Sequence, residues 1–374
     1  MAGAVLVVGG YGAFGARAVR HLARLGIAHV IIAGRDLGRA EAAARDLAHA
    51  HHIDVSALAI DAERPDLEAL KNSRSRVVLN ASGPFQAQSY ALAQAAIAAG
   101  MHYVDLADSR PFVEGITTLD AAARAAGVLV ASGASSVPAL SCAAVDALAD
   151  RFQRIEEIDI GISPANGFDP GIATTRAVLC GLGRPMPRLR DGAWGVAYGW
   201  QDAYRRPLGD LGPRWFANCD VPDLTLLPQR YPDARTVRFT AGVEVAAMFG
   251  GLWLMSWLAR ARIVPKPDAF ARPLMWVKRR LSFLGSDAGG MYVRVSGIGR
   301  DGKPAAGEWT IIARQNHGPF IPPAPAAVLA ARLANGDVSR TGATACLGLM
   351  KLSEIEAVFD GLDVVTRIDP SPGP

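Results

Sequence analysis

Short apolar runs alternate with helical patterns through the first 150 residues. The first run, 4–8 (AVLVV), is rich in β-branched residues and has no polar break, as expected for a strand buried on both faces of a parallel sheet. After a glycine-rich turn, Val19, Leu22 and Leu25 recur at helical intervals until Gly26 ends the pattern. Further runs predict strands at 29–33, 57–60, 76–79, 103–106 and 128–131. The alternation predicts an α/β fold with a Rossmann-type, doubly wound parallel sheet.

The hydrophobic pattern changes near residue 150. Residues 156–163 (EEIDIGIS) have the alternating pattern of a strand, and so do residues 291–298. Asp301-Gly302 then provides a hairpin turn before a returning strand at 309–313. A proline cluster precedes a predicted helix at 324–333. The pattern predicts a second α+β domain with a mainly antiparallel sheet.

The turn after the first strand has the spacing of a dinucleotide-binding site. Three glycines in GGYGAFG would let the chain turn tightly, let the backbone approach a pyrophosphate, and let the helix pack on the strand. The phosphates would lie at the helix N-terminus, where free N–H groups favour anions. The candidate cofactor-binding residues of this turn are Gly10, Tyr11, Gly12, Ala13, Phe14 and Gly15.

The residues after the second strand indicate which dinucleotide binds. NAD is typically bound there by an acid that contacts the ribose 2′-hydroxyl, whereas this chain has Gly34 followed by Arg35 and, one turn later, Arg39. Two guanidinium groups favour the 2′-phosphate of NADP. The alternative is that Asp36 binds the ribose and both arginines lie on a solvated helix face.

The loops at the carboxyl ends of the other strands should form the rest of the cofactor site, because ligands of such sheets bind at that edge. Asp61, after the third strand, would accept a hydrogen bond from the adenine amino group. The turn after the fourth strand would pass under the ribose and nicotinamide. It consists of Asn80, Ala81, Ser82, Gly83, Pro84 and Phe85. Each loop also fits a simple turn without a ligand.

Four residues are candidate catalytic residues. Reduction of a substrate needs a group that protonates or polarises it, and His102, Asp105 and Asp108 are expected at the end of the fifth strand. His317 lies in the segment QNHGPF. Both histidines also fit structural roles, and Asp105 would equally accept hydrogen bonds from loop amides.

The composition excludes a disordered, a fibrous and a low-complexity protein. Half of the 374 residues are hydrophobic and 20% are charged, which is typical of a folded globular chain. The four cysteines are far apart, which predicts a reducing, cytoplasmic compartment. The histidines of segment 49–52 (HAHH) follow a predicted helix, far from the strand ends, and we expect no metal site.

The net charge of +4 is concentrated in one segment. Seven basic residues and one acid, Asp268, lie between Arg260 and Arg280. Such a patch without a recognisable nucleic-acid module predicts no nucleic-acid partner. The preceding apolar stretch, 245–259, has Trp253 and Trp257 four residues apart and is interpreted first as a buried helix. The alternatives for 245–280 are peripheral contact with a membrane, a pocket for a lipid-like chain, or a dimer contact.

Several motifs together resemble the saccharopine dehydrogenase-like NADP-binding family. They are GGYGAFG, AGRD, LNASGPF, AAGMHYVDLAD and SGASSVPAL in residues 3–150, with GGMYVRVSGIGRDGKPAAGEWTIIA, HGPFIPPAPAAVLAARLANG and TGATACLGLMKL further on. The resemblance implies an NADP-binding Rossmann domain at 1–150 and an α+β substrate and dimerisation domain at 151–320. It also implies that segment 321–374 packs back on the first domain, and it places His317 after a strand of the second.

The resemblance implies an NADP-dependent oxidoreductase that reduces a C=N, C=O or C=C bond of a small metabolite, expected as a cytoplasmic homodimer. The turn at 135–139 and the segment 105–108 depart from the family pattern. We therefore expect the NADP-binding half of the resemblance to carry over and the substrate half not to. The alternatives are an enoyl reductase acting on a lipid-like or polyketide chain, and a non-catalytic NADP-binding sensor or membrane-associated scaffold.

Overall fold

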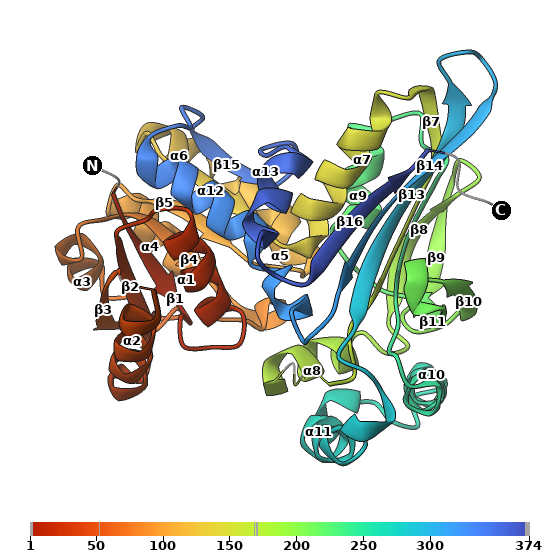
Figure 1. Cartoon of the computed structure of the whole chain (residues 1–374), viewed down its shortest axis with the longest axis horizontal. Coiled ribbons are helices and arrows are strands. Elements are labelled where there is room, and N and C mark those ends of the chain that lie inside the picture. Colours follow the sequence, from red (N-terminus) through yellow and green to blue (C-terminus); the bar gives the residue numbers. More distant parts are fainter. Residues whose placement is uncertain (1–2, 52, 168, 170, 371–374) are drawn as a thin grey trace. The chain divides into compact units, whose positions relative to one another are not determined.

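The computed structural model describes residues 3–51, 53–167, 169 and 171–370, so His52 of the HAHH segment lies outside the described residues. The chain forms two compact units, and each is built from two stretches of sequence (Figure 1). The first unit runs to Leu140 and resumes over Pro319–Val358. The second comprises Ser141–Gly318 and continues from Phe359.

The first unit contains a seven-stranded sheet in the order β15-β6-β5-β4-β1-β2-β3, and every pairing is parallel. Its strands are β1 (Ala4–Val8), β2 (His29–Gly34), β3 (Asp54–Ala59), β4 (Ser75–Asn80), β5 (His102–Asp105), β6 (Leu129–Ser132) and β15 (Gly342–Ala345). The order β3-β2-β1-β4-β5-β6 is that of dinucleotide-binding sheets. The predicted Rossmann-type fold is therefore confirmed.

Helices pack on the sheet of the first unit. They are α1 (Gly15–Arg24), α2 (Leu37–His51), α3 (Leu67–Asn72), α4 (Ala91–Ala98), α5 (Arg110–Gly115), α6 (Asp120–Ala125), α12 (Ala324–Asn335) and α13 (Leu352–Glu356). The predicted helix at 324–333 is α12, which ends at Gly336 with a left-handed φ of 86°. It packs against α1, β1, β4 and β5, so the later stretch of chain covers the first sheet.

The second unit contains a mixed nine-stranded sheet. The main order is β10-β11-β12-β7-β13-β14-β16, with β8 paired to β12 and β9. The strands are β7 (Phe152–Ser163), β8 (Pro185–Arg190), β9 (Ala193–Tyr198), β10 (Tyr204–Pro207), β11 (Pro213–Asn218), β12 (Thr236–Ala241), β13 (Gly289–Gly299), β14 (Pro304–Ala313) and β16 (Val364–Asp369). Among the described residues, the strand pairings of this sheet are antiparallel except for β12 with β7, and β13 and β14 form the predicted hairpin. The predicted α+β domain is confirmed.

Within the described residues, the second unit has five α-helices. They are α7 (Ser141–Ala149), α8 (Gly171–Cys180), α9 (Asp223–Arg230), α10 (Ala246–Arg260) and α11 (Ala271–Arg280). Helix α7 packs on β7, β13 and β14, whereas Leu179, Phe249 and Ala271 join α8, α10 and α11 in a separate apolar cluster.

The structure divides the chain differently from the predicted bounds of 1–150, 151–320 and 321–374. Helix α7 belongs to the second unit because it packs on that sheet, which moves the first division to residues 140 and 141. Segment 321–374 is split at Val358, because β16 pairs with β14 in the second sheet.

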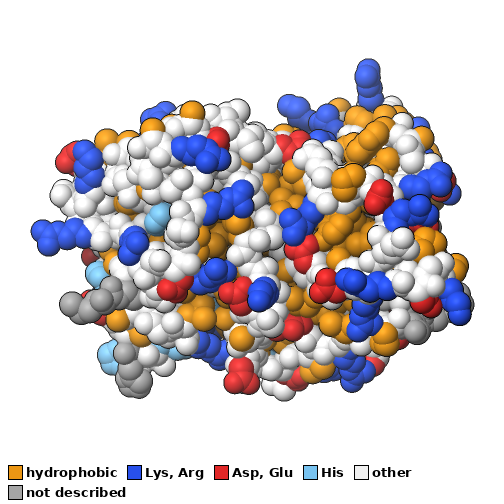
Figure 2. Space-filling model, turned by 90° about the horizontal axis from the view of Figure 1, so that it is seen from above, with side chains coloured by type: hydrophobic (Ala, Val, Ile, Leu, Met, Phe, Trp, Pro, Cys, Tyr) orange, Lys and Arg blue, Asp and Glu red, His pale blue; other side chains and the backbone are white. Residues whose placement is uncertain are grey.

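On the face shown in Figure 2, basic and acidic side chains are interspersed.

Helix α10 is not the buried helix that the sequence predicted first. Phe249 and Ser256 are buried, but Trp253 is 38% exposed and Trp257 is 43% exposed. The apolar stretch therefore has one face in the core and one at the surface. Over the part of the chain that the structure describes, no helix is both long and apolar enough to cross a membrane.

Candidate functional site

The glycine turn between β1 and α1 is held by close backbone contacts. Gly9 has a φ of 80°, and its carbonyl oxygen accepts a hydrogen bond from the Gly12 N–H at 2.8 Å. A Cβ on Gly15 would lie 2.1 Å from the same oxygen, so only glycine lets α1 start this close to the turn. The turn thus uses Gly9, Gly12 and Gly15, spaced three residues apart.

Gly9 is the residue of this turn that the sequence prediction missed. The tight turn was assigned to Gly10, but the left-handed φ lies at Gly9. Gly10 is needed for packing, because a Cβ there would lie 2.9 Å from the Val7 oxygen and 3.0 Å from Cγ2 of Ile32. The signal was present, since GGYGAFG contains both possible glycine spacings.

The end of β2 carries an aromatic and cationic cluster of Tyr11, Arg35 and Arg39. A Cβ on Gly34 would lie 2.5 Å from the Tyr11 side chain, so the tyrosine ring covers the last residue of β2. The Arg39 guanidinium lies over this ring, 4.6 Å from its centroid. The Tyr11 hydroxyl also accepts a hydrogen bond from the Asp36 N–H at 3.3 Å. The ring therefore joins the glycine turn to the start of α2.

The charges at this strand end suit an anion. Asp36 Oδ1 accepts a hydrogen bond from the Arg39 N–H at 3.0 Å, so this carboxylate caps α2. Arg35 and Arg39 are exposed, and within the described ranges neither forms an ion pair. Two cations with a capped neighbouring acid would hold a 2′-phosphate better than a ribose hydroxyl.

The β4 turn is fixed by a network around the buried Asn80. Asn80 Oδ1 accepts hydrogen bonds from N and Oγ of Ser82 at 3.0 and 2.5 Å, and Nδ2 donates to the Tyr103 hydroxyl at 3.0 Å. Gln88 Nε2 donates to the Ser82 oxygen at 2.5 Å. The Ala81 N–H bonds to the Val8 oxygen at 2.8 Å, which brings this turn beside the glycine turn.

The remaining predicted cofactor residues differ in exposure. Ala13, Gly83 and Pro84 are exposed, and Phe14 and Asp61 are half-buried. The Asp61 carboxylate accepts a hydrogen bond from the Glu63 N–H at 3.0 Å, which stabilises the turn after β3. Phe85 is buried against the ring of Phe112, with 5.4 Å between centroids, so it acts as a core residue of this unit.

Asp105 lies at the carboxyl end of β5 and is fully buried. Its Oδ1 accepts hydrogen bonds from the Ala107 N–H at 3.0 Å, the Ser132 hydroxyl at 3.0 Å and the Gly133 N–H at 2.8 Å. The contacts with Ala107 and Gly133 are the hydrogen bonds from loop amides that the sequence analysis gave as the alternative to a catalytic role. Burial raises the pKa of Asp105 to about 6, although the hydrogen bonds lower it in part.

The other catalytic candidates lie in three different places. Asp108 is exposed after β5 and accepts a hydrogen bond from Gln86 Nε2 at 3.2 Å, which links two loops at the carboxyl edge. His102 was predicted at the carboxyl end of the fifth strand, and this prediction is wrong. It begins β5 at the opposite edge, where its Nδ1 accepts a hydrogen bond from the Leu129 N–H at 2.9 Å. The pKa of His102 is lowered by burial and by nearby Arg76.

His317 belongs to the second unit. It follows β14, and its Nδ1 accepts a hydrogen bond from the Asp363 N–H at 2.8 Å. This contact holds the imidazole beside the segment that leads into β16.

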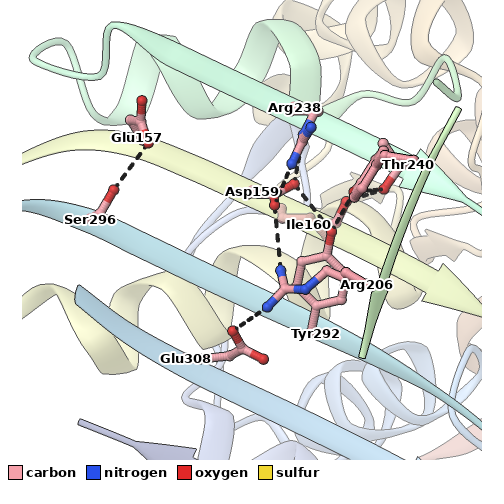
Figure 3. A network of polar contacts seen from close by, with 10 residues as sticks. Glu157, Asp159, Ile160, Arg206, Arg238, Thr240, Tyr292, Ser296 and Glu308 are labelled. Carbon is pink, nitrogen blue, oxygen red and sulfur yellow. Dashed lines mark hydrogen bonds and ion pairs between the residues drawn. The ribbon is translucent and has the colours of Figure 1, made fainter. Parts of the chain in front are cut away.

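One face of the second sheet carries an ion network that the sequence did not reveal (Figure 3). Asp159 on β7 accepts hydrogen bonds from Nε and Nη2 of Arg238 on β12 at 2.9 and 2.7 Å, and Arg206 Nη2 on β10 lies 2.6 Å from Glu308 on β14. The Arg206 guanidinium also stacks over Tyr292 at 3.8 Å. The four charged residues of this network line a cavity of about 1130 Å³. The two arginines and two carboxylates of the network balance in charge, which is typical of a network that ties strands together.

The structure also bears on metal binding. Among the side chains that are described, no group of three or more histidines, cysteines or acids is close enough to hold a metal ion.

Comparison with known proteins shows that these features lie in a region that matches a known family model. The family model described as the saccharopine dehydrogenase NADP binding domain matches residues 5–131. These residues include the glycine turn, the Tyr11 cluster, the Asn80 turn and Asp105. The sequence resemblance is thereby confirmed, NADP is the cofactor of such a domain, and a domain of this kind indicates an oxidoreductase. No curated protein sequence matches the chain.

Solved structures resemble the chain to different extents. The apo structure of L-Glu-forming saccharopine dehydrogenase from Saccharomyces cerevisiae has 15% identity and a TM-score of 0.67, covering 98% of this chain and 100% of that one. A structure described as a probable dehydrogenase from Thermotoga maritima matches at 8% identity with a TM-score of 0.45, and the match covers 95% of this chain and 93% of that one. A short-chain dehydrogenase from Sphingobium yanoikuyae covers 35% of this chain and 71% of its own at 21% identity, with a TM-score of 0.26.

At 15% identity the yeast likeness establishes the fold and leaves the substrate open. Residues 5–131 match the model of the saccharopine dehydrogenase NADP binding domain, and the fold of the chain is similar to that of the yeast saccharopine dehydrogenase along nearly its whole length.

Proposed function

We propose that the chain is an NADP-dependent oxidoreductase that reduces a C=N, C=O or C=C bond of a small metabolite. The observation that carries the proposal is the combination of the Gly9–Gly15 turn with Arg35 and Arg39 at the end of β2. When bound, the nicotinamide supplies or accepts the hydride. The protein must then position both reactants and exclude water.

The residues of the first unit support the cofactor half of the proposal. The N-terminus of α1, which follows the glycine turn directly, would bind the pyrophosphate. Arg35 and Arg39 would bind the 2′-phosphate, and Asp61 would contact the adenine. The Asn80 turn, held by Gln88 and Tyr103, would support the ribose and nicotinamide.

The proton donor is assigned by position and exposure. Asp108 is an exposed carboxyl group that follows β5 at the carboxyl edge of the first sheet, and His317 is the candidate in the second unit. Asp105 would act as a positioning residue, because its Oδ1 holds Ala107 and Gly133. We leave His102 out of the site because it lies at the other end of β5.

The test is NADPH consumption, followed by absorbance, with a panel of carbonyl, imine and enoyl compounds. The proposal predicts turnover with at least one class, and loss of turnover in Asp108→Asn or His317→Gln with NADPH binding retained. Turnover only with long-chain enoyl compounds would favour the lipid-like enoyl reductase. NADPH binding without any turnover would favour the sensor or scaffold, and binding of neither coenzyme would refute the proposal. A homodimer and a cytoplasmic location stay predictions.

A further inference from the structure

Helix α10 is apolar around its whole circumference, but only one side is packed. Phe249, Leu252, Met255 and Ser256 face the cluster shared with α8 and α11. The opposite side exposes Gly250 and the triplet of Trp253, Leu254 and Trp257, and Leu254 is 55% exposed. The two tryptophan rings contact each other edge to face, with 6.2 Å between centroids. Such a surface is unusual for a helix facing only water.

Helix α11 and its flanks expose further large apolar side chains. Trp276 is 60% exposed, and Phe283, just after the helix, is 77% exposed. Ile263, in the connection between α10 and α11, is 68% exposed. Ala271 and Met275 form the buried side of α11, so its exposed aromatics face away from the core. Figure 1 shows both helices at the same end of the second sheet.

Basic side chains surround the exposed aromatics. Arg262, Lys266 and Arg272 are exposed, and among the described residues none of them forms an ion pair. The Arg280 guanidinium lies 5.3 Å from the centroid of the Trp276 ring. Asp268 is the one acid between Arg260 and Arg280 in the sequence, and Asp169 pairs with Arg279 at 2.8 Å, so the segment keeps an excess of positive charge. Its partner should therefore combine negative charge with an apolar interior.

We propose that residues 250–284 form a docking surface for an anionic lipid bilayer. Tryptophan is the side chain enriched at the level of lipid headgroups, and Lys and Arg bind anionic headgroups. Helix α10 has 15 residues and spans about 22 Å, which is shorter than the hydrocarbon core of a bilayer. It would therefore lie in the plane of the membrane surface, with Trp253 and Trp257 inserted and Arg262, Lys266 and Arg272 at the headgroups.

The test is co-sedimentation of the full chain with vesicles of phosphatidylcholine alone or with 30% phosphatidylglycerol. The proposal predicts binding to the anionic vesicles, at least tenfold weaker binding to the neutral ones, and release at high salt. The triple variant Arg262→Glu, Lys266→Glu, Arg272→Glu should lose binding at least tenfold. The double variant Trp253→Ser, Trp257→Ser should also lose it, because insertion of the rings would be removed.

Matched variants separate a local effect from a general one. Arg45→Glu, Arg64→Glu and Lys303→Glu together remove the same charge from exposed positions elsewhere, and Trp194→Ser removes a tryptophan that is 56% exposed on β9. Both should bind vesicles like the original chain. Circular dichroism and NADPH binding show that each variant is folded.

Three results would overturn the proposal. The first is no binding to either vesicle at low salt. The second is equal binding to neutral and anionic vesicles. The third is a concentration-dependent dimer that Trp253→Ser, Trp257→Ser abolishes while vesicles are not bound, since a second copy of the chain would then cover the surface. Because vesicle binding needs no coenzyme, each outcome is independent of the reductase proposal.

Discussion

Replacing Arg35 by alanine tests the cofactor site most directly. Arg35 follows the last residue of β2 and is exposed, with no ion pair to a described residue. Its removal therefore leaves no buried carboxylate without a partner, and any change in binding reflects the lost contact with the coenzyme. We expect Arg35→Ala to weaken NADPH binding and to leave NADH binding unchanged.

The size of the effect follows from the exposure of the guanidinium. A hydrogen bond to a charged group contributes about 1.5–3 kcal/mol, and the lower value applies at a site open to water. About 1.5 kcal/mol corresponds to roughly a tenfold increase in Kd. The double variant Arg35→Ala, Arg39→Ala should weaken NADPH binding further, because Arg39 also holds the Tyr11 ring.

Fluorescence titration with NADPH and NADH measures both dissociation constants. Arg45→Ala is the control, because Arg45 is an exposed arginine of α2, the helix that follows Arg35, and lies farther from the strand end. It should leave both constants unchanged. If Arg35→Ala lowers affinity for both coenzymes equally, or for neither, the assignment of Arg35 to the 2′-phosphate is refuted.

Two further predictions concern stability. Gly15→Ala places a Cβ 2.1 Å from the Gly9 oxygen, so thermal unfolding should show that the free energy of unfolding falls by about 1–3 kcal/mol. The control, Gly250→Ala, places a Cβ in open space and should show no such loss. Equal stabilities of the two variants would contradict the close contact at Gly15. The raised pKa of Asp105, about 6, means that the folded chain holds a proton that the unfolded chain has released, so stability should fall as pH rises from about 4 to 6. Urea unfolding should show this fall, by about 3 kcal/mol, in the original chain relative to Asp105→Asn; parallel pH profiles would contradict it.

The first sheet could be predicted because its strands are buried on both faces. The predicted strands at 4–8, 29–33 and 76–79 are apolar except for His29 and Arg76, each the first residue of its run, and β1, β2 and β4 differ from them by at most one residue at either end. Strand edges were harder to predict, which is why His102 was placed at the wrong end of β5. The sequence does not show at which residue β5 begins, and without that residue His102 cannot be assigned to one edge of the sheet or the other.

Features that depend on distant pairs could not be predicted. Asp159, Arg206 and Glu308 are far apart in sequence and meet only because β7, β10 and β14 enter one sheet. The surface of α10 was hidden for another reason: its sequence is apolar on every side, so periodicity does not indicate which face is packed.

The division of the first unit into two stretches has a consequence for biosynthesis. Strand β6 pairs with β15, and α12 covers β1, β4 and β5, but both partners come after Gly318 in the chain. While the ribosome is still producing the second unit, the first sheet has an open edge and an uncovered apolar face. The nascent chain must keep that surface from aggregating until Val358 has emerged, so this stage is where a chaperone would be needed.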